Sequence, residues 1–253
     1  MYQVQHSYQV HIRRYQVPRT RYQVPRERYQ VRRLMLSERV VLPEVLSGPA
    51  VFAGDDTCLT IGLLAGLRAV RPGRPLLIVD GANAFDPFLV ADLARKSGLP
   101  PGALLDQIRI SRVFTCHQLE ALLRERLGAA VQQFHTPAVY FSGLLDPLLS
   151  EEAPAGEAAR IFRLVIPALQ RLAGAGVVTL AACPGLSVVE GPPPHSTPGR
   201  ERFFPALCQA AAWVFRVARA ADGDAVQITC TKPQAARWTW EPQMGMITAR
   251  RWR

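Results

Sequence analysis

The sequence predicts an α/β protein with a mostly parallel central sheet flanked by helices and a C-terminal antiparallel hairpin. Short runs rich in apolar residues alternate along the chain with longer segments of helical periodicity, and loops with glycine or proline separate them. Residues 76–123 contain two such strand, loop and helix units in succession. This alternation is typical of parallel strands joined by crossover helices, whose ligands bind at the carboxyl ends of the strands.

Each expected element follows from its own apolar pattern. Strands are expected at residues 50–53, 76–80, 108–113, 138–142, 177–182, 213–218 and 225–230. Helices are expected to begin near Leu59, Phe88, His117, Glu157 and Phe203. Asp222 and Gly223 predict the turn of the terminal hairpin, and Pro167 predicts a kink in the helix at 157–173.

The length of 253 residues allows one substantial core, and residues 35–253 are expected to form a single domain with a basic C-terminal tail. No apolar run reaches the roughly 18–20 residues that cross a bilayer, and the N-terminus lacks the apolar centre of a signal peptide. We therefore expect a cytoplasmic protein without a membrane partner. The 5 cysteines are scattered and form no CxxC pair, so neither a disulfide framework nor a metal site is expected.

The positive charge is concentrated at the N-terminus. Of the formal net charge of +10, residues 1–33 contribute +7, from eight arginines and one glutamate, and the remaining residues contribute +3. The globular part is therefore close to neutral, and its charge alone predicts no nucleic-acid binding.

Residues 1–34 form an arm in which Tyr-Gln-Val occurs five times. Pro18 and Pro25 would break a coiled coil, so that disorder is expected. One interpretation makes the arm a nucleic-acid contact, with arginines that neutralise phosphates and tyrosines that stack on bases. The other makes it a translated tandem repeat upstream of a true start at Met35, and the second is favoured because the repeat shares no character with the rest of the chain.

The first strand, loop and helix lie where a nucleotide-binding α/β protein carries its phosphate loop. That loop needs the pattern GxxxxGK[ST], in which glycines let backbone amides approach the phosphates and lysine supplies charge. The window at 53–60, AGDDTCLT, keeps only the final threonine of this pattern. A degenerate nucleotide site is thus expected at Gly54, Asp55, Asp56, Thr57, Cys58, Leu59 and Thr60.

Residues 85–123, FDPFLVADLARKSGLPPGALLDQIRISRVFTCHQLEALL, resemble the RecA-type recombinase superfamily, in particular its archaeal and eukaryotic strand-exchange branch. The match includes a helix start at Cys116, His117 and Gln118, and a weaker resemblance covers residues 49–233. It implies a RecA-like P-loop NTPase fold. It also implies where the catalytic groups of that superfamily would fall in this chain.

Those catalytic groups are replaced here. The resemblance places the catalytic glutamate at Ala82 in the loop after Asp80, the phosphate-loop lysine at Leu59 and the Walker B aspartate at Ser142. We therefore expect no ATP hydrolysis and no cofactor. The alternative is a weak ATP and magnesium site whose lysine comes from elsewhere, with Lys232 as its candidate.

The resemblance also places two DNA-binding loops, at 145–156 and 185–202. Asp146, Glu151 and Glu152 make the first acidic and unsuited to phosphate contact, and the second is weakly basic. The C-terminal tail offers either a stacking platform for bases or a strand whose tryptophans pack on the core, and both interpretations stay open. The candidate nucleic-acid contacts are His195, Arg200, Arg202, Arg237, Trp238, Trp240, Arg250 and Arg251.

Two further pairs allow a chemical interpretation. Asp80 and Asp86 have the residue type of an acid and base pair, but loop capping is the favoured role because no nucleophile or metal-ligand spacing accompanies them. Cys116 and His117 have the residue types of a nucleophile pair, but adjacent helical residues point about 100° apart. His117 is therefore expected to be structural.

These observations together predict a non-catalytic RecA-like accessory protein in DNA recombination, repair or damage-induced mutagenesis. Its expected partner is another RecA-like subunit or a DNA-repair protein. The alternatives are a weak ATPase with a non-standard phosphate loop and a protein that binds single-stranded DNA directly.

Overall fold

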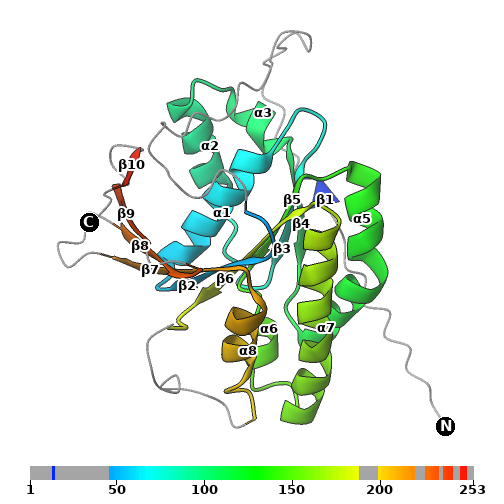
Figure 1. Cartoon of the computed structure of the whole chain (residues 1–253). Helices are drawn as coiled ribbons and strands as arrows, with labels where there is room; N and C mark the ends of the chain where they lie inside the picture. Colours follow the sequence, from blue (N-terminus) through cyan, green and yellow to red (C-terminus); the bar gives the residue numbers. More distant parts are fainter. Residues whose placement is uncertain are drawn as a thin grey trace.

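The computed structural model describes residues 13–14, 46–187, 199–219, 226–233, 236–241 and 246–249. Their strands form one 10-stranded sheet in the order β1-β4-β3-β5-β6-β2-β7-β8-β9-β10 (Figure 1). The strands are β1 (Arg13–Arg14), β2 (Ala50–Gly54), β3 (Leu76–Asp80), β4 (Ile108–Arg112), β5 (Ala138–Ser142), β6 (Val178–Pro184), β7 (Trp213–Arg219), β8 (Val226–Lys232), β9 (Ala236–Glu241) and β10 (Met246–Ala249).

The central strands β4, β3, β5, β6, β2 and β7 run parallel, and β8, β9 and β10 extend the sheet in antiparallel fashion. The predicted α/β class with a mostly parallel sheet is confirmed. The predicted hairpin is also confirmed, because β7 pairs antiparallel with β8. Its turn lies outside the described residues.

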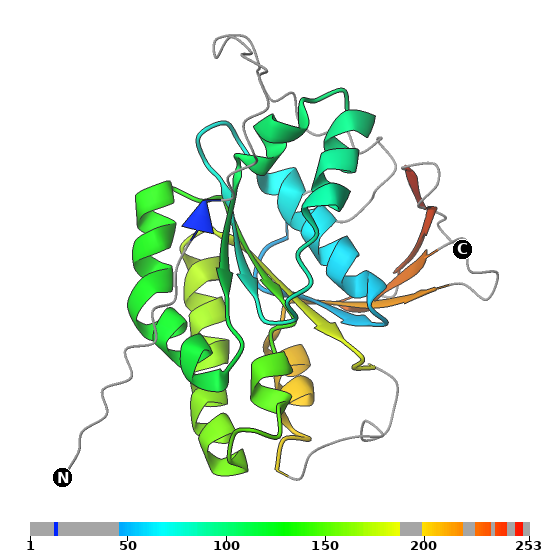
Figure 2. The ribbon, with the colours of Figure 1, turned by 180° about the vertical axis from the view of Figure 1, so that it is seen from behind.

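Helices cover both faces of the sheet (Figures 1 and 2). One face carries α1 (Thr57–Ala69), α2 (Pro87–Lys96) and α3 (Pro101–Leu105). The other carries α4 (Cys116–Ala121), the π-helical turn η1 (Leu122–Arg126), α5 (Leu127–Phe134), α6 (Asp146–Leu149), α7 (Ala155–Gly174) and α8 (Phe203–Ala210).

Strand residues alternate between two apolar clusters, one under each helical layer. In β5, Tyr140 packs in the cluster beneath α1, whereas Val139 and Phe141 pack in the cluster beneath α7. Because side chains of a strand point alternately to opposite faces, a strand buried on both faces must be apolar throughout. This is why β3 and β5 appear in the sequence as apolar runs up to their last residues, Asp80 and Ser142.

Helix boundaries depart from the predicted ones where a cap or a proline decides them. α2 begins at Pro87 because the Asp86 carboxylate accepts a hydrogen bond from the backbone N–H of Phe88 at 2.8 Å. α3 is absent from the predicted elements. It begins at Pro101, and a proline in the first turn loses no helical hydrogen bond. Pro100 and Pro101, which predict a break in the sequence, therefore also start a short helix.

Of residues 1–45, the structure describes only β1, which pairs antiparallel with β4. The predicted disorder of the rest of the arm lies outside the described residues. None of the helices among the described residues has the length and apolar character needed to span a membrane.

Candidate functional site

The strand register brings most of the predicted nucleotide-site positions to one edge of the sheet. Asp80, at the end of β3, lies opposite Ser142, at the end of β5. Gly54, at the end of β2, lies opposite Pro184, at the end of β6, which in turn pairs with β5. Since parallel strands end on the same side, residues far apart in the chain share this carboxyl edge.

The connection between β2 and α1 is too short for a phosphate loop. Only Asp55 and Asp56 separate Gly54 from the first residue of α1, Thr57. Gly54 has a φ of 144°, and a Cβ atom there would lie 1.7 Å from the carbonyl oxygen of Val217. The backbone therefore turns tightly against the end of β7 and leaves no loop that could enclose phosphates.

The carboxylate of Asp55 occupies the N-terminus of α1. It accepts hydrogen bonds from the backbone N–H of Thr57 at 2.9 Å and of Arg219 at 2.7 Å, and also from the Thr57 hydroxyl. Burial raises the pKa of Asp55, but these hydrogen bonds outweigh that effect and hold it below its ordinary value. The protein thus places its own anion where a helix N-terminus would bind a phosphate.

Asp80 and Asp86 are capping residues, as predicted. Asp80 is fully buried and accepts hydrogen bonds from the backbone N–H groups of Ala84 at 3.1 Å and Phe85 at 3.2 Å. Arg112 lies 3.7 Å from the same carboxylate. The loop is also tied to β5, because the N–H of Ala82 donates to the carbonyl of Ser142 at 3.1 Å. These contacts hold in place the loop to which the resemblance assigns the catalytic glutamate.

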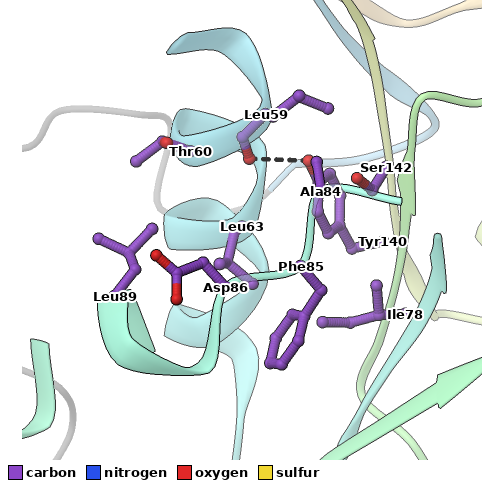
Figure 3. Close-up of a pocket in the computed structure, with 10 residues that line it drawn as sticks. All are labelled: Leu59, Thr60, Leu63, Ile78, Ala84, Phe85, Asp86, Leu89, Tyr140 and Ser142. Atoms are coloured by element: carbon purple, nitrogen blue, oxygen red, sulfur yellow. Dashed lines mark hydrogen bonds between the residues drawn. The ribbon is translucent and has the colours of Figure 1, made fainter. Parts of the chain in front are cut away.

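A small cavity of about 30 Å³ lies between α1, α2 and the loop after β3 (Figure 3). Small-molecule sites typically measure roughly 300–1,000 Å³, whereas this volume corresponds to about one water molecule. The Tyr140 hydroxyl crosses to α1 and donates to the Leu59 carbonyl at 2.7 Å. The lining residues are Leu59, Thr60, Leu63, Ile78, Ala84, Phe85, Asp86, Leu89, Tyr140 and Ser142.

Asp146 adds a carboxylate to this edge. Burial, together with the charges of Asp80 and Asp56, raises its pKa from 3.8 to about 6. Among the described residues, no group of three or more histidine, cysteine or acidic side chains is arranged to hold a metal ion. The edge is therefore acidic, which opposes the binding of phosphate.

Replacing Asp146 with asparagine is expected to raise the free energy of unfolding at pH 7.5 by about 1–2 kcal/mol, and by much less at pH 4. The pKa of Asp146 rises from 3.8 in the unfolded state to about 6 in the folded state, so the carboxyl costs no stability at a pH where it is protonated in both states. The destabilisation by its charge increases as the pH rises from 3.8 to about 6. Urea unfolding at both pH values, with the exposed Asp106→Asn as control, measures this difference. An equal effect at both pH values would show that charge is not the cause.

Lys232 is engaged away from this edge. Its Nζ donates to the backbone carbonyls of Gln209 at 2.8 Å, Ala211 at 2.6 Å and Cys208 at 3.4 Å. These carbonyls lie at the C-terminal end of α8, where a cation stabilises the helix. Lys232 therefore caps α8 and does not replace the missing phosphate-loop lysine.

The structure corrects one of the predicted nucleic-acid contacts. Arg200 is only 3% exposed, and its guanidinium donates to the carbonyls of Ser150 and Ala153. Its charge serves to hold the loop before α7, so it is not available to a phosphate. Arg202, two residues later, is exposed and stays a candidate.

The tail candidates are described only in part. The strand register pairs Trp238 with Ile228, Trp240 with Val226 and Arg237 with Thr229. His195, Arg250 and Arg251 lie outside the described residues. The two interpretations of the tail therefore stay predictions.

Cys116 and His117 do not form a nucleophile pair. Cys116 is buried, and burial raises the pKa of its thiol. His117 instead lies 3.7 Å from the carboxylate of Glu157 on α7. Beside it, Arg160 of α7 makes a bidentate ion pair with Glu120 of α4 at 2.6 and 2.7 Å. The predicted structural role of His117 is thus a contact between two helices.

Sequence reasoning missed Tyr140 and the pair of Glu120 and Arg160. Tyr140 lies 81 positions from its partner Leu59, and Arg160 lies 40 positions from Glu120. The local sequence pattern around these residues does not predict contacts with such distant partners. Comparison of the chain with protein-family models and with curated proteins finds no match, so the functional assignment rests on the geometry of the carboxyl edge.

Proposed function

We propose that this chain is a RecA-like domain that has lost nucleotide chemistry and acts as an accessory protein in DNA recombination, repair or damage-induced mutagenesis. It works by contact with another RecA-like subunit or a DNA-repair protein. One observation carries the loss of nucleotide chemistry: the Asp55 carboxylate occupies the N-terminus of α1 within a connection of two residues.

The arrangement of the sheet supports the RecA-like assignment. The strand that would precede a phosphate loop, β2, lies between β6 and β7 inside the parallel part of the sheet. The positions that the resemblance assigns to the catalytic glutamate and the Walker B aspartate, Ala82 and Ser142, contact each other through the backbone. An ancestral nucleotide site at this edge accounts for both features.

Electrostatics supports the loss of phosphate binding. A single pair of like charges at 4 Å costs about 4 kcal/mol at an effective dielectric constant near 20. A triphosphate at α1 would meet Asp55 and Asp56 with no lysine to offset them. Binding energy for ATP would have to come from elsewhere, and the cavity beside α1 is too small to provide it.

Exposed aromatic rings support a role in protein contact. Phe88, in the first turn of α2, is 79% exposed, and Phe114, between β4 and α4, is 55% exposed. Both follow the carboxyl ends of their strands. Large exposed aromatic side chains contribute strongly to protein interfaces, because they bury much area at little entropic cost.

The melting temperature of the full chain is expected to stay unchanged in 5 mM MgATP, and the chain is expected to release no phosphate from ATP. A ligand at one hundred times its Kd stabilises a protein by about 2.7 kcal/mol, so even an affinity near 50 μM would produce a clear shift. Thermal unfolding and titration with a fluorescent ATP analogue test this.

The Asp55→Asn variant is the matched control for that experiment, since it removes the charge and keeps the size of the side chain. If the variant also fails to bind, the short connection excludes nucleotide by its shape. Micromolar binding of MgATP by the natural sequence would contradict the proposal.

A further inference from the structure

The amino edge of the sheet, opposite the candidate site, carries a cluster of cationic residues. They come from the end of α1, from the turn between α1 and β3, and from β4. We name this cluster the arginine corner, and its members are Arg68, Arg71, Arg74 and Arg109.

The fold holds these groups close together. Arg71 and Arg74 pair across a tight turn, and Gly73 adopts the positive φ of 74° that this turn needs. The Nε of Arg74 donates to the carbonyl of His135 at 2.8 Å, which joins the turn to the end of α5. The Arg109 guanidinium lies 5.6 Å from the ring centroid of Phe134, the neighbour of His135.

Few acidic residues neighbour Arg71 and Arg74 in the sequence. Asp106 is the single acidic residue in the segments 68–74 and 106–109 that build the corner. Within the described part of the chain, no ion pair joins Arg71 or Arg74 to a carboxylate, whereas Arg160 is paired with Glu120. Both Arg71 and Arg74 are exposed. Arg71 donates through Nη1 to the carbonyls of Arg68 at 3.0 Å and Val70 at 2.8 Å, and Arg74 donates through Nε. Since a guanidinium has five N–H donors, both side chains keep donors that an anion can accept from.

The arginine-rich arm meets the sheet at the same corner. In the register of β1 and β4, Arg14 lies opposite Arg109 and Arg13 opposite Ile110. Like charges directly opposite each other destabilise a strand pair. Both views show β1 beside the α1–β3 turn and the end of α5 (Figures 1 and 2). Strand β1 of the arm therefore lies at the arginine corner, although the two are distant in the sequence.

We propose that the arginine corner binds the phosphate backbone of a nucleic acid. Guanidinium groups bind phosphate in bidentate fashion, and several of them at one edge can bind more than one phosphate of a polyanion. The arm favours nucleic acid over an acidic protein, because tyrosine recurs between its arginines and can stack on bases. This surface differs from the predicted DNA-binding loops and tail, and it does not depend on the proposed function.

Fluorescence anisotropy of a labelled 30-nucleotide single strand, titrated with the full chain at several salt concentrations, tests the proposal. Arg71→Ala with Arg74→Ala is expected to weaken binding about tenfold at low salt and to reduce the slope of log K against log salt by about 1.4, or 0.7 per lost phosphate contact. Arg71→Lys with Arg74→Lys keeps both charges and should keep most of the slope. Thermal unfolding of each variant confirms that it is folded.

Arg163→Ala with Arg171→Ala is the matched control. It removes two exposed arginines from α7, so the net charge changes equally, and its affinity should fall less than about twofold. Equal losses in the two alanine pairs would overturn the proposal, because net charge alone would then explain binding. Absence of salt-dependent binding would also overturn it. Competition by polyglutamate as strong as that by unlabelled DNA would assign the corner to an acidic protein instead.

Discussion

Replacing Gly54 with alanine is expected to lower the free energy of unfolding by more than about 4 kcal/mol. The added Cβ would lie 1.7 Å from the backbone carbonyl oxygen of Val217, and the φ of 144° is one that residues other than glycine rarely adopt. Since the obstacle is backbone, β2 and β7 must separate to relieve the overlap. That movement would also disturb the hydrogen bond between Asp55 and the N–H of Arg219. Urea unfolding followed by circular dichroism measures the loss.

Gly128→Ala is the control for this prediction. Gly128 lies in α5, and a Cβ atom there would have no neighbour within 4 Å. Alanine in a helix is favoured over glycine by about 1 kcal/mol, so this variant should be slightly more stable than the natural sequence. If Gly54→Ala were tolerated as well as Gly128→Ala, the connection between β2 and α1 would not be tight, and it would no longer exclude a phosphate loop.

Replacing Arg200 with alanine is expected to cost about 3 kcal/mol of stability. The variant leaves the carbonyls of Ser150 and Ala153 without their donor and opens a cavity beside α7. The exposed Arg202→Ala, two residues away, should change stability by less than about 0.5 kcal/mol. Chemical denaturation of both variants distinguishes a buried structural arginine from an exposed one. If both substitutions had equally small effects on stability, Arg200 would again be a candidate nucleic-acid contact.

Local patterns in the sequence are sufficient to place the strands of the parallel sheet. Residues 76–79 and 138–141 form continuous runs of buried aliphatic and aromatic side chains because both faces of each strand are buried, and this pattern is visible in the sequence alone. Capping is equally local. Asp86 caps the helix that begins one residue later, so the sequence alone favours that role over catalysis.

Contacts between distant segments decided what the candidate site can do. Asp55 meets the N–H of Arg219, 164 positions away, and Arg200 reaches the carbonyl of Ser150, 50 positions away. The sequence shows where arginine and aspartate residues occur, but it does not show which backbone groups they will form hydrogen bonds with. Arg200 is therefore a basic loop residue in the sequence and a buried support in the folded protein.

What the sequence by itself determined is the class of the fold, because periodicity and residue identity are properties of short segments. The tertiary structure alone decided that the Asp55 carboxylate occupies the start of α1, that Lys232 caps α8 and that Arg74 contacts the carbonyl of His135 at the amino edge. These outcomes depend on strand order and register, which bring residues together only when the whole sheet has formed.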